Sequence, residues 1–292
     1  MGDVHCGPSG SPTPTAQWQV STNGGSTWAN TSGSFVAITS DTGNEYRAVF
    51  TNTAGSATTN AATLTVLFPA QSTPNQSGYL AYAEPGESFT AVSASWTVPT
   101  VTCPPGATTD SAQWPGIGDD TTVQQDGTEA GCSAGTPYYY AWYEMYGDPD
   151  FNGGNWGEDV LSEQSYPVAP GDVITASVRV AGATWFLAIT DANRWSWSID
   201  IPSPPIPLSE ASAEWIAEVP ATSCDPQCTF GTLADFSPVT FTGATATGNG
   251  QSGPISSFPL AALQITGGST VFAAPGPLDA TGDAFTDTWY AN

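Results

Sequence analysis

Two glutamates stand four residues apart in a short apolar stretch, and they are the first candidates for chemistry in the chain. The stretch is ASAEWIAEVP, from Ala211 to Pro220, and its acids are Glu214 and Glu218. Side chains alternate between faces along a β-strand, so both acids would share a face with Ile216. A buried carboxylate without a partner is costly. Two interpretations follow: a solvated strand at a sheet edge, or acids kept for function.

A second stretch places aromatic rings beside a carboxylate. In PYYYAWYEMY, residues 137–146, strand alternation puts five side chains on one face: Tyr138, Tyr140, Trp142, Glu144 and Tyr146. Such a face is typical of a cleft that grips an extended or planar ligand. The alternative is an aromatic core face with an ion-paired glutamate. That alternative is weakened because the chain has only 3 Lys and Arg residues in total.

The chain has few residues that could support histidine-based catalysis or bind a metal ion. The single histidine, His5, lies near the start of the chain, which argues against an ordinary Ser–His or Cys–His triad. The five cysteines lack the spacing of a zinc site. We therefore expect neither a metal ion nor another cofactor.

The cysteines instead suggest disulfides. Cys103 can pair with Cys132, and Cys224 with Cys228 across the turn SCDPQC, which leaves Cys6 over. Disulfides indicate an oxidising compartment, so we expect a secreted protein. Residues 1–10 have no apolar signal-peptide core, so a leader, if there is one, is not in this sequence.

Charge is the strongest global signal. The chain has 27 Asp and Glu residues against 3 Lys and Arg, a formal net charge of -24 at pH 7. Nucleic acid is therefore an improbable partner. No apolar run approaches the roughly 20 residues of a membrane helix, so we expect no membrane partner either. Because the carboxylates neutralise in acid, we predict greater stability in acid than at neutral pH.

The elements that must position these residues are predicted to be β-strands. Helix formers are scarce, and 31 Gly and 25 Pro residues punctuate the chain. Residues 1–66 resemble part of a bacterial immunoglobulin-like domain, with Trp18 at the core position of a central strand. Residues 67–77 are polar, contain two prolines and are expected to be a linker. Residues 78–292 are expected to form a large antiparallel sheet system.

Three motifs in order resemble those of the eqolisins, the glutamic peptidases. They are TVQQDGTEAGC, YYYAWYEMY and SAEWIAE, and the resemblance covers residues 78–292. It implies a lectin-like all-β sandwich of two bent antiparallel sheets, a polypeptide substrate in extended conformation, and a catalytic dyad of Gln125 and Glu218. The residues expected to bind substrate, from the resemblance and from the aromatic face, are Trp114, Trp142, Glu144 and Tyr146.

The chemistry suits acid conditions. A carboxylate with a pKa near ~4 remains a usable base where histidine would be protonated. Glu218 is expected to take a proton from water and return it to the leaving amine, while the Gln125 amide orients the water and stabilises the oxyanion. The expectation is a secreted acid endopeptidase that acts as a monomer.

Other functions compete with this interpretation. A carbohydrate-active or carbohydrate-binding β-sandwich would also use acids and aromatic rings. Glu214 and Glu218 would lie roughly 13 Å apart along a strand, beyond the ~5 to 9.5 Å used by glycosidases. Glu144 and Glu218 could still meet across strands. A non-catalytic adhesin is a further alternative, whereas an aspartic peptidase is disfavoured because no paired D-T-G or D-S-G motifs occur.

Overall fold

The computed structural model describes residues 11–35, 41, 43–64, 67–148, 157–192, 194–204, 207–224 and 228–291, without the side chains of residues 67–69 and 224. The chain forms two compact units. The first comprises Met1–Leu67 with Ser256–Pro259, and the second Phe68–Ile255 with Leu260–Asn292. None of the described residues forms a helix with the length and apolar character needed to cross a membrane.

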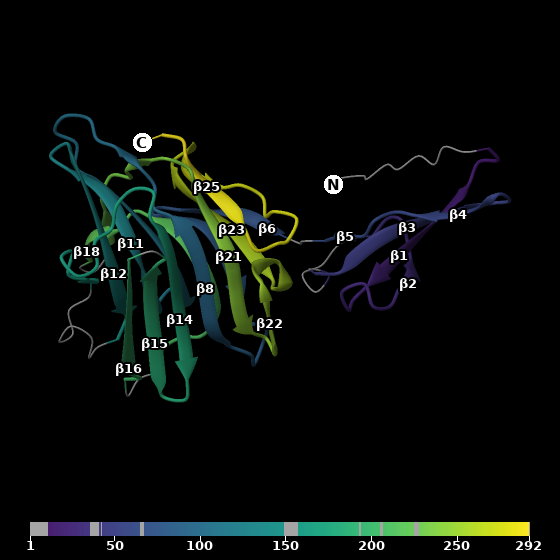
Figure 1. Cartoon of the computed structure of the whole chain (residues 1–292), viewed down its shortest axis with the longest axis horizontal. Coiled ribbons are helices and arrows are strands. Elements are labelled where there is room, and N and C mark those ends of the chain that lie inside the picture. The colour runs from purple at the N-terminus through teal and green to yellow at the C-terminus, as the bar shows by residue number, and fades with distance from the viewer. Residues whose placement is uncertain are drawn as a thin grey trace. The chain divides into compact units, whose positions relative to one another are not determined.

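The first unit contains one antiparallel sheet with the strand order β2-β1-β3-β4, and β5 also pairs with β3. The strands are β1 (Thr15–Ser21), β2 (Ala29–Thr31), β3 (Glu45–Asn52), β4 (Gly55–Thr58) and β5 (Ala62–Thr63), drawn from purple to blue in Figure 1. The guanidinium of Arg47 lies over the ring of Trp28 at 3.9 Å. The immunoglobulin-like character of residues 1–66 stays a prediction.

Residues 67–73 and 76–77 are strands, so the expected linker is wrong. β6 (Leu67–Thr73) pairs with β23 (Leu260–Gly267), and β7 (Gln76–Tyr82) lies between β23 and β17. The polar, proline-containing sequence is compatible with a strand here because, among the described strands, β6 pairs only with β23. An edge strand of this kind tolerates proline, which a central strand does not. The Thr73 hydroxyl bridges the turn by donating to the carbonyl of Gln76, 2.6 Å away.

The second unit is an antiparallel sandwich, as predicted. Its main sheet follows the order β13-β12-β11-β10-β17-β7-β23-β24-β25-β21-β8-β14-β15-β16 and folds over on itself. One layer contains β12 (Thr136–Tyr146), β11 (Val123–Ser133), β10 (Thr109–Gly118), β17 (Ser212–Glu218), β7 and β23. The facing layer contains β21 (Val239–Gly248), β8 (Phe89–Thr97), β14 (Val173–Ala181), β15 (Thr184–Asp191) and β16 (Trp195–Pro202), which lie side by side in Figure 1.

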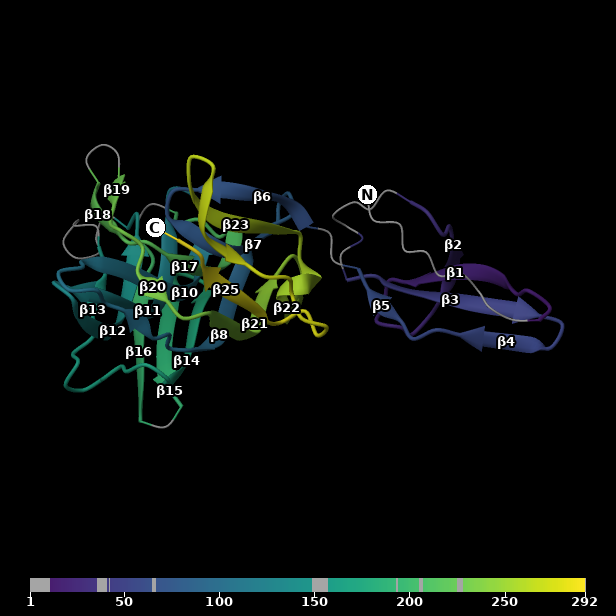
Figure 2. The same cartoon turned by 90° about the horizontal axis from the view of Figure 1, so that it is seen from above.

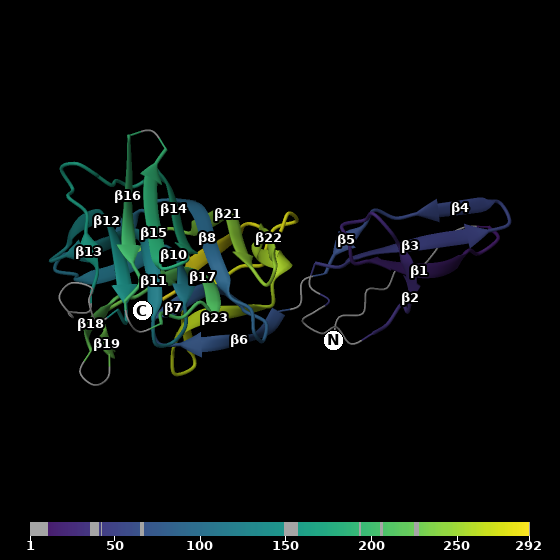
Figure 3. The ribbon, with the colours of Figure 1, turned by 90° about the horizontal axis from the view of Figure 1, so that it is seen from below.

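The remaining elements connect or border these layers. They are β9 (Val101–Thr102), β13 (Asp159–Val160), β18 (Ala221–Cys224), β19 (Cys228–Phe230), β20 (Asp235–Phe236), β22 (Gln251–Pro254), the 3-10 helix η3 (Ile255–Ser257), β24 (Thr270–Pro275) and β25 (Phe285–Trp289). Figures 2 and 3 show the same strands from above and from below.

Tryptophans join the two layers at the centre of the core. The indole N–H of Trp215 on β17 donates to the carbonyl of Ser93 on β8, and that of Trp96 on β8 donates to the Thr128 hydroxyl on β11, each at 3.0 Å. Both rings are fully buried. Strand alternation therefore sends one set of side chains into this core and leaves the other set of β10, β11, β12 and β17 for a site.

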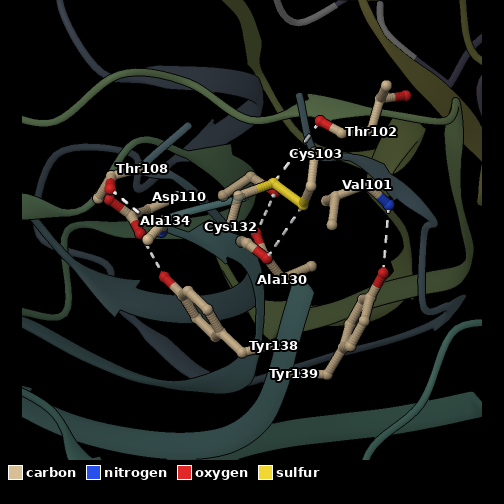
Figure 4. Close-up of a disulfide and its surroundings, with 12 residues drawn as sticks. Val101, Thr102, Cys103, Thr108, Asp110, Ala130, Cys132, Ala134, Tyr138 and Tyr139 are labelled. Atoms are coloured by element: carbon tan, nitrogen blue, oxygen red, sulfur yellow. Dashed lines mark hydrogen bonds between the residues drawn. A yellow bond between two sulfur atoms is a disulfide. The ribbon is translucent and has the colours of Figure 1, made fainter. Parts of the chain in front are cut away.

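The predicted disulfide between Cys103 and Cys132 is present, with a Cα–Cα distance of 5.6 Å (Figure 4). It ties the segment after β9 to the end of β11. Cys228 is also disulfide-bonded. The side chain of Cys224, its expected partner, and the whole of Cys6 lie outside the described residues.

Candidate active site

Strand register builds the site by aligning the outer faces of β12, β11, β10 and β17. One cross-strand row contains Glu144, Gln125, Gly116 and Glu214, and another contains Tyr140, Glu129, Ala112 and Glu218. Tryptophans of the intervening positions, Trp114 and Trp142, lie between these rows. The chain therefore brings Gln125 and Glu218 to one face although they are 93 positions apart in sequence (218 − 125).

A cavity of about 800 Å³ opens over this face. All six residues that the sequence singled out line it: Trp114, Gln125, Trp142, Glu144, Tyr146 and Glu218. Every charged residue of the described lining is an Asp or a Glu, and no Lys, Arg or His is among the described residues that form it. The cavity therefore carries a strongly negative potential whenever its acids are ionised.

Glu218 is held by two N–H donors. The indole N–H of Trp114 donates to Oε2 at 2.8 Å, and the side-chain amide of Asn75 donates to Oε1 at 2.6 Å. Both bonds favour the ionised carboxylate. Burial is the larger effect and, together with the nearby charges of Glu144 and Glu214, raises the pKa of Glu218 to about 8. The pKa of Glu218 therefore lies well above the value near 4 expected from sequence, because the carboxyl is buried among other acids.

The Gln125 amide is oriented by Glu144. Nε2 of Gln125 donates to Oε2 of Glu144 at 2.8 Å, while Oε1 of Glu144 accepts the backbone N–H of Gly157 at 3.0 Å. An ionised carboxylate only accepts, so this contact fixes which end of the amide faces it. Oε1 of Gln125 is then left buried without a hydrogen-bond partner, and one N–H of Nε2 stays available. Burial raises the pKa of Glu144, and the Gln125 and Gly157 bonds lower it.

Glu214 lies deeper than Glu218 on the same strand. It is 3% exposed, and the Ser212 hydroxyl donates to its Oε1 at 2.6 Å. Burial raises the pKa of Glu214 to about 7. The interpretation of this stretch as a solvated sheet edge is wrong, because β17 has a paired strand on each side, β10 and β7.

Sequence reasoning missed several residues of the cavity. Asn75 was assigned to the linker, although it precedes the strand that pairs with β17. Glu129 lies four residues after Gln125 on the same strand face, so alternation within β11 could have identified it. Asp110 on β10 and Glu158, which precedes β13, also line the cavity, and neither lies within a stretch that the sequence analysis singled out.

Comparison with known proteins identifies the family. The model of the Peptidase A4 family matches residues 74–274. No curated protein matches the chain. Two structures of Scytalido-glutamic peptidase, one with a peptide-based transition-state analogue and one with a transition-state analogue inhibitor, are each 22% identical to the chain. Their TM-scores are 0.59 and 0.60, and each match covers 74% of this chain and 98% of the other.

Aspergilloglutamic peptidase from Aspergillus niger is 25% identical, with a TM-score of 0.51, and the match covers 62% of this chain and 99% of that protein. The family match selects a peptidase over a carbohydrate-active protein or an adhesin. It spans more than two-thirds of the chain and includes the strands that carry Gln125 and Glu218. The chain therefore belongs to the Peptidase A4 family, the eqolisins, and is a hydrolase acting on peptide bonds.

Proposed function

We propose that the protein is an acid endopeptidase in which Gln125 and Glu218 act together on one water molecule. The observation that carries the proposal is that the buried acceptor Oε1 of Gln125 has no hydrogen-bond partner, while Gln125 and Glu218 line the same cavity. A polypeptide in extended conformation would lie along this cavity between the aromatic side chains. The attacking water would donate a hydrogen bond to Oε1 of Gln125 and transfer its other proton to Glu218 as its oxygen bonds to the scissile carbonyl carbon.

The amide of Gln125 can both orient the attacking water and stabilise the oxyanion. Its acceptor orients the water, and its remaining N–H points a dipole at the oxygen that becomes negative in the tetrahedral intermediate. Glu144 supports this by holding the other N–H. An amide keeps these donors and acceptors at every pH, so the arrangement survives in acid.

Glu218 would first act as a base and then as an acid. Its raised pKa makes its carboxylate a stronger proton acceptor than an ordinary glutamate, although fewer molecules carry that carboxylate in acid. After attack, the protonated carboxyl has the proton that the leaving amine requires. Trp114 and Asn75 hold the two oxygens, so the carboxyl stays in place through both steps.

We also propose that the protein works outside the cell. The Cys103–Cys132 disulfide requires an oxidising compartment to form and persist. Detection of the protein in the culture medium of its source, rather than in the cell lysate, is the expected result.

Cleavage of a denatured protein at about pH 4, with pepstatin present, tests the mechanism. Glu218→Gln and Gln125→Ala are each expected to lower kcat/KM by about a hundredfold or more, with unchanged circular dichroism. Glu87→Gln, a change at an exposed acid outside the cavity, is the matched control. Intact substrate with the wild type, or activity that persists in both variants, would defeat the assignment.

A further inference from the structure

We propose that strand β6 is a substrate-binding wall of the cavity, where Gln71 binds the main chain of a peptide several residues away from the scissile bond. An apolar side chain of the same part of the peptide packs on Leu80. We name Gln71, Leu80 and Tyr82 the remote subsite. It rests on the proposed endopeptidase function, and it specifies the length and the kind of peptide that this function favours.

Strand β6 lies outside the family match and yet lines the cavity. The match begins at residue 74, whereas β6 spans Leu67–Thr73. Gln71 and Thr73 are both among the residues that form the cavity wall. Membership of the family therefore assigns no role to this part of the wall.

The strand is held on both of its faces. The side-chain amide of Gln264 on β23 donates to the Ser72 hydroxyl at 3.4 Å. The Thr73 hydroxyl donates to the carbonyl of Gln76 at 2.6 Å and accepts its N–H at 2.8 Å. Because side chains alternate along a strand, Gln71 shares the face of Thr73, opposite to Ser72. The wall is therefore fixed, and it points Gln71 at the cavity.

The amide of Gln71 is oriented but retains hydrogen-bonding capacity. Its Nε2 donates to the Tyr82 hydroxyl at 3.2 Å, and the side chain is exposed. A primary amide has two N–H donors and an acceptor oxygen, so one donor and the acceptor remain for a ligand. A peptide group offers the matching C=O and N–H. An extended main chain in the cavity therefore suits this amide.

An apolar surface lies beside the amide. Leu80 is two positions before Tyr82 on the same face of β7, and it lines the cavity. It is half-buried and packs against a cluster that includes Ile216 and Leu263. Glu214 pairs with Leu80, but burial raises the pKa of Glu214 to about 7, so this acid is uncharged at pH 4. The surface therefore favours an uncharged, apolar side chain.

The remote subsite is separated from the proposed catalytic acid along β7. Gln76 pairs with Glu218. Tyr82 lies six positions further along the strand (82 − 76), about 20 Å between the Cα atoms of Gln76 and Tyr82. An extended peptide covers such a distance with about six residues. A short peptide that is cleaved at Glu218 therefore does not reach Gln71.

A series of peptides of increasing length tests the proposal. All share one cleaved sequence and are extended by alanine, one residue at a time, at one end or the other. When the peptide reaches the remote subsite, kcat/KM is expected to rise by on the order of tenfold. At that position, leucine is expected to exceed serine, because its side chain packs on Leu80.

Gln71→Ala is expected to lose most of this gain and to keep the wild-type kcat/KM for the shortest cleaved peptide. Ser72→Ala is the matched control, because Ser72 is the next residue of β6 and lies on the opposite face. It should keep the full gain. Both positions are exposed, so thermal melts like that of the wild type are expected and are measured first.

Methylation of the substrate main chain gives a readout that a loosened strand would not change. An N-methyl group at the position that reaches the remote subsite removes the N–H offered to Gln71. It should lower kcat/KM of the wild type and of Ser72→Ala, and leave that of Gln71→Ala unchanged. An equal loss in all three enzymes would show that Gln71 does not bind the main chain, and the proposal would be wrong.

The remaining outcomes separate this proposal from the function on which it rests. Equal kcat/KM for short and long peptides, or a Gln71→Ala enzyme with the full gain, overturns the remote subsite and leaves the endopeptidase intact. The same is true if Ser72→Ala loses as much of the gain as Gln71→Ala. A wild type that cleaves no peptide of any length overturns both.

Discussion

At the scale of single residues, the carboxyl of Glu218 owes its place to side chains from two other segments. Trp114 comes from β10, and Asn75 precedes β7. Neither contact could be predicted from the sequence. Trp114 is 104 residues and Asn75 is 143 residues before Glu218 in the chain. The sequence motif could identify the acid, whereas the partners that fix its geometry depend on strand order.

Asn75→Ala is expected to lower kcat by about tenfold while KM changes little. The variant loses the N–H donor 2.6 Å from Oε1, and a hydrogen bond to a charged group contributes about 1.5–3 kcal/mol. Because that bond favours the ionised form, its loss should raise the pKa of Glu218 further. Steady-state kinetics across pH check this, and the low-pH limb of the kcat profile should shift upward.

The matched control is Asn30→Ala, on an exposed position of the N-terminal sheet. It removes the same chemical group without touching the cavity. An Asn75→Ala enzyme with wild-type kcat and an unmoved pH profile would mean that Asn75 does not position the acid.

At the scale of elements, glycine decides how closely the strands of the site approach. A Cβ placed on Gly127 of β11 would lie 2.2 Å from the carbonyl oxygen of Gln113 and 2.8 Å from Cβ of Trp114. Only a residue without a side chain therefore allows β10 to carry the indole that reaches Glu218. The site depends on this close approach as much as on its polar groups.

Gly127→Ala is expected to destabilise the protein by about 1–3 kcal/mol and to reduce activity by more than its stability loss explains. Both clashes involve atoms that cannot rotate away, so β10 must shift, and overpacking of this kind has about that cost. Urea denaturation gives the first quantity, and kcat/KM at a temperature where the variant is folded gives the second.

Gly276→Ala serves as the comparison, because its new Cβ would meet only one atom, the Thr286 carbonyl oxygen at 3.3 Å. It should be milder in both measurements. Equal effects of the two substitutions would show that the approach at Gly127 has no special importance for the site.

Strand alternation predicted much of this layer correctly. The five side chains of residues 137–146 that were expected to share a face do so, and Glu214 and Glu218 also share one. The prediction of a linker was wrong because local composition cannot reveal that β6 pairs with β23, which lies almost 190 residues later in the chain. The insertion of β10 between β11 and β17 is equally non-local, and the cavity exists only because of it.

At the scale of the whole molecule, buried acids add to the effect of net charge. The carboxyls of Glu214 and Asp287 are nearly inaccessible, and burial raises the pKa of each to about 7. Asp126 is fully buried, and burial likewise raises its pKa. Asp119 differs, because hydrogen bonds from Thr121, Ser209 and Thr122 lower its pKa to about 2.

These shifts fix the sign of the pH dependence. An acid whose pKa is raised by folding stabilises the native state fully below its unfolded value, near 4, and loses that contribution as pH rises through its folded value. For the buried acids that window is about pH 4 to 8. Asp119 acts in the opposite sense, and its contribution is lost only as pH falls toward about 2. Stability should therefore be highest in mild acid and decline toward neutrality.

Asp287→Asn isolates one of these groups. The carboxyl is 0% exposed and accepts from the Ser77 hydroxyl at 2.8 and 3.0 Å, and an amide of the same shape cannot ionise. The free energy of unfolding should change little near pH 4. At pH 8 the variant should exceed the wild type by on the order of 4 kcal/mol, because it lacks a carboxyl whose pKa is about 7 in the folded protein and near 4 in the unfolded chain. Asp200→Asn, at an exposed acid, is the matched control.

Salt distinguishes the buried acids from the repulsion of a chain with a formal net charge of -24. At about 1 M salt the Debye length falls to about 3 Å, so repulsion between surface charges is screened while the cost of ionising a buried carboxyl remains. Denaturation at pH 4 and pH 8, in low and high salt, should leave a decline with pH that Asp287→Asn reduces in both. A wild type more stable at pH 8 than at pH 4 in high salt would show that these acids are ionised at no cost inside the fold, and the prediction would be wrong.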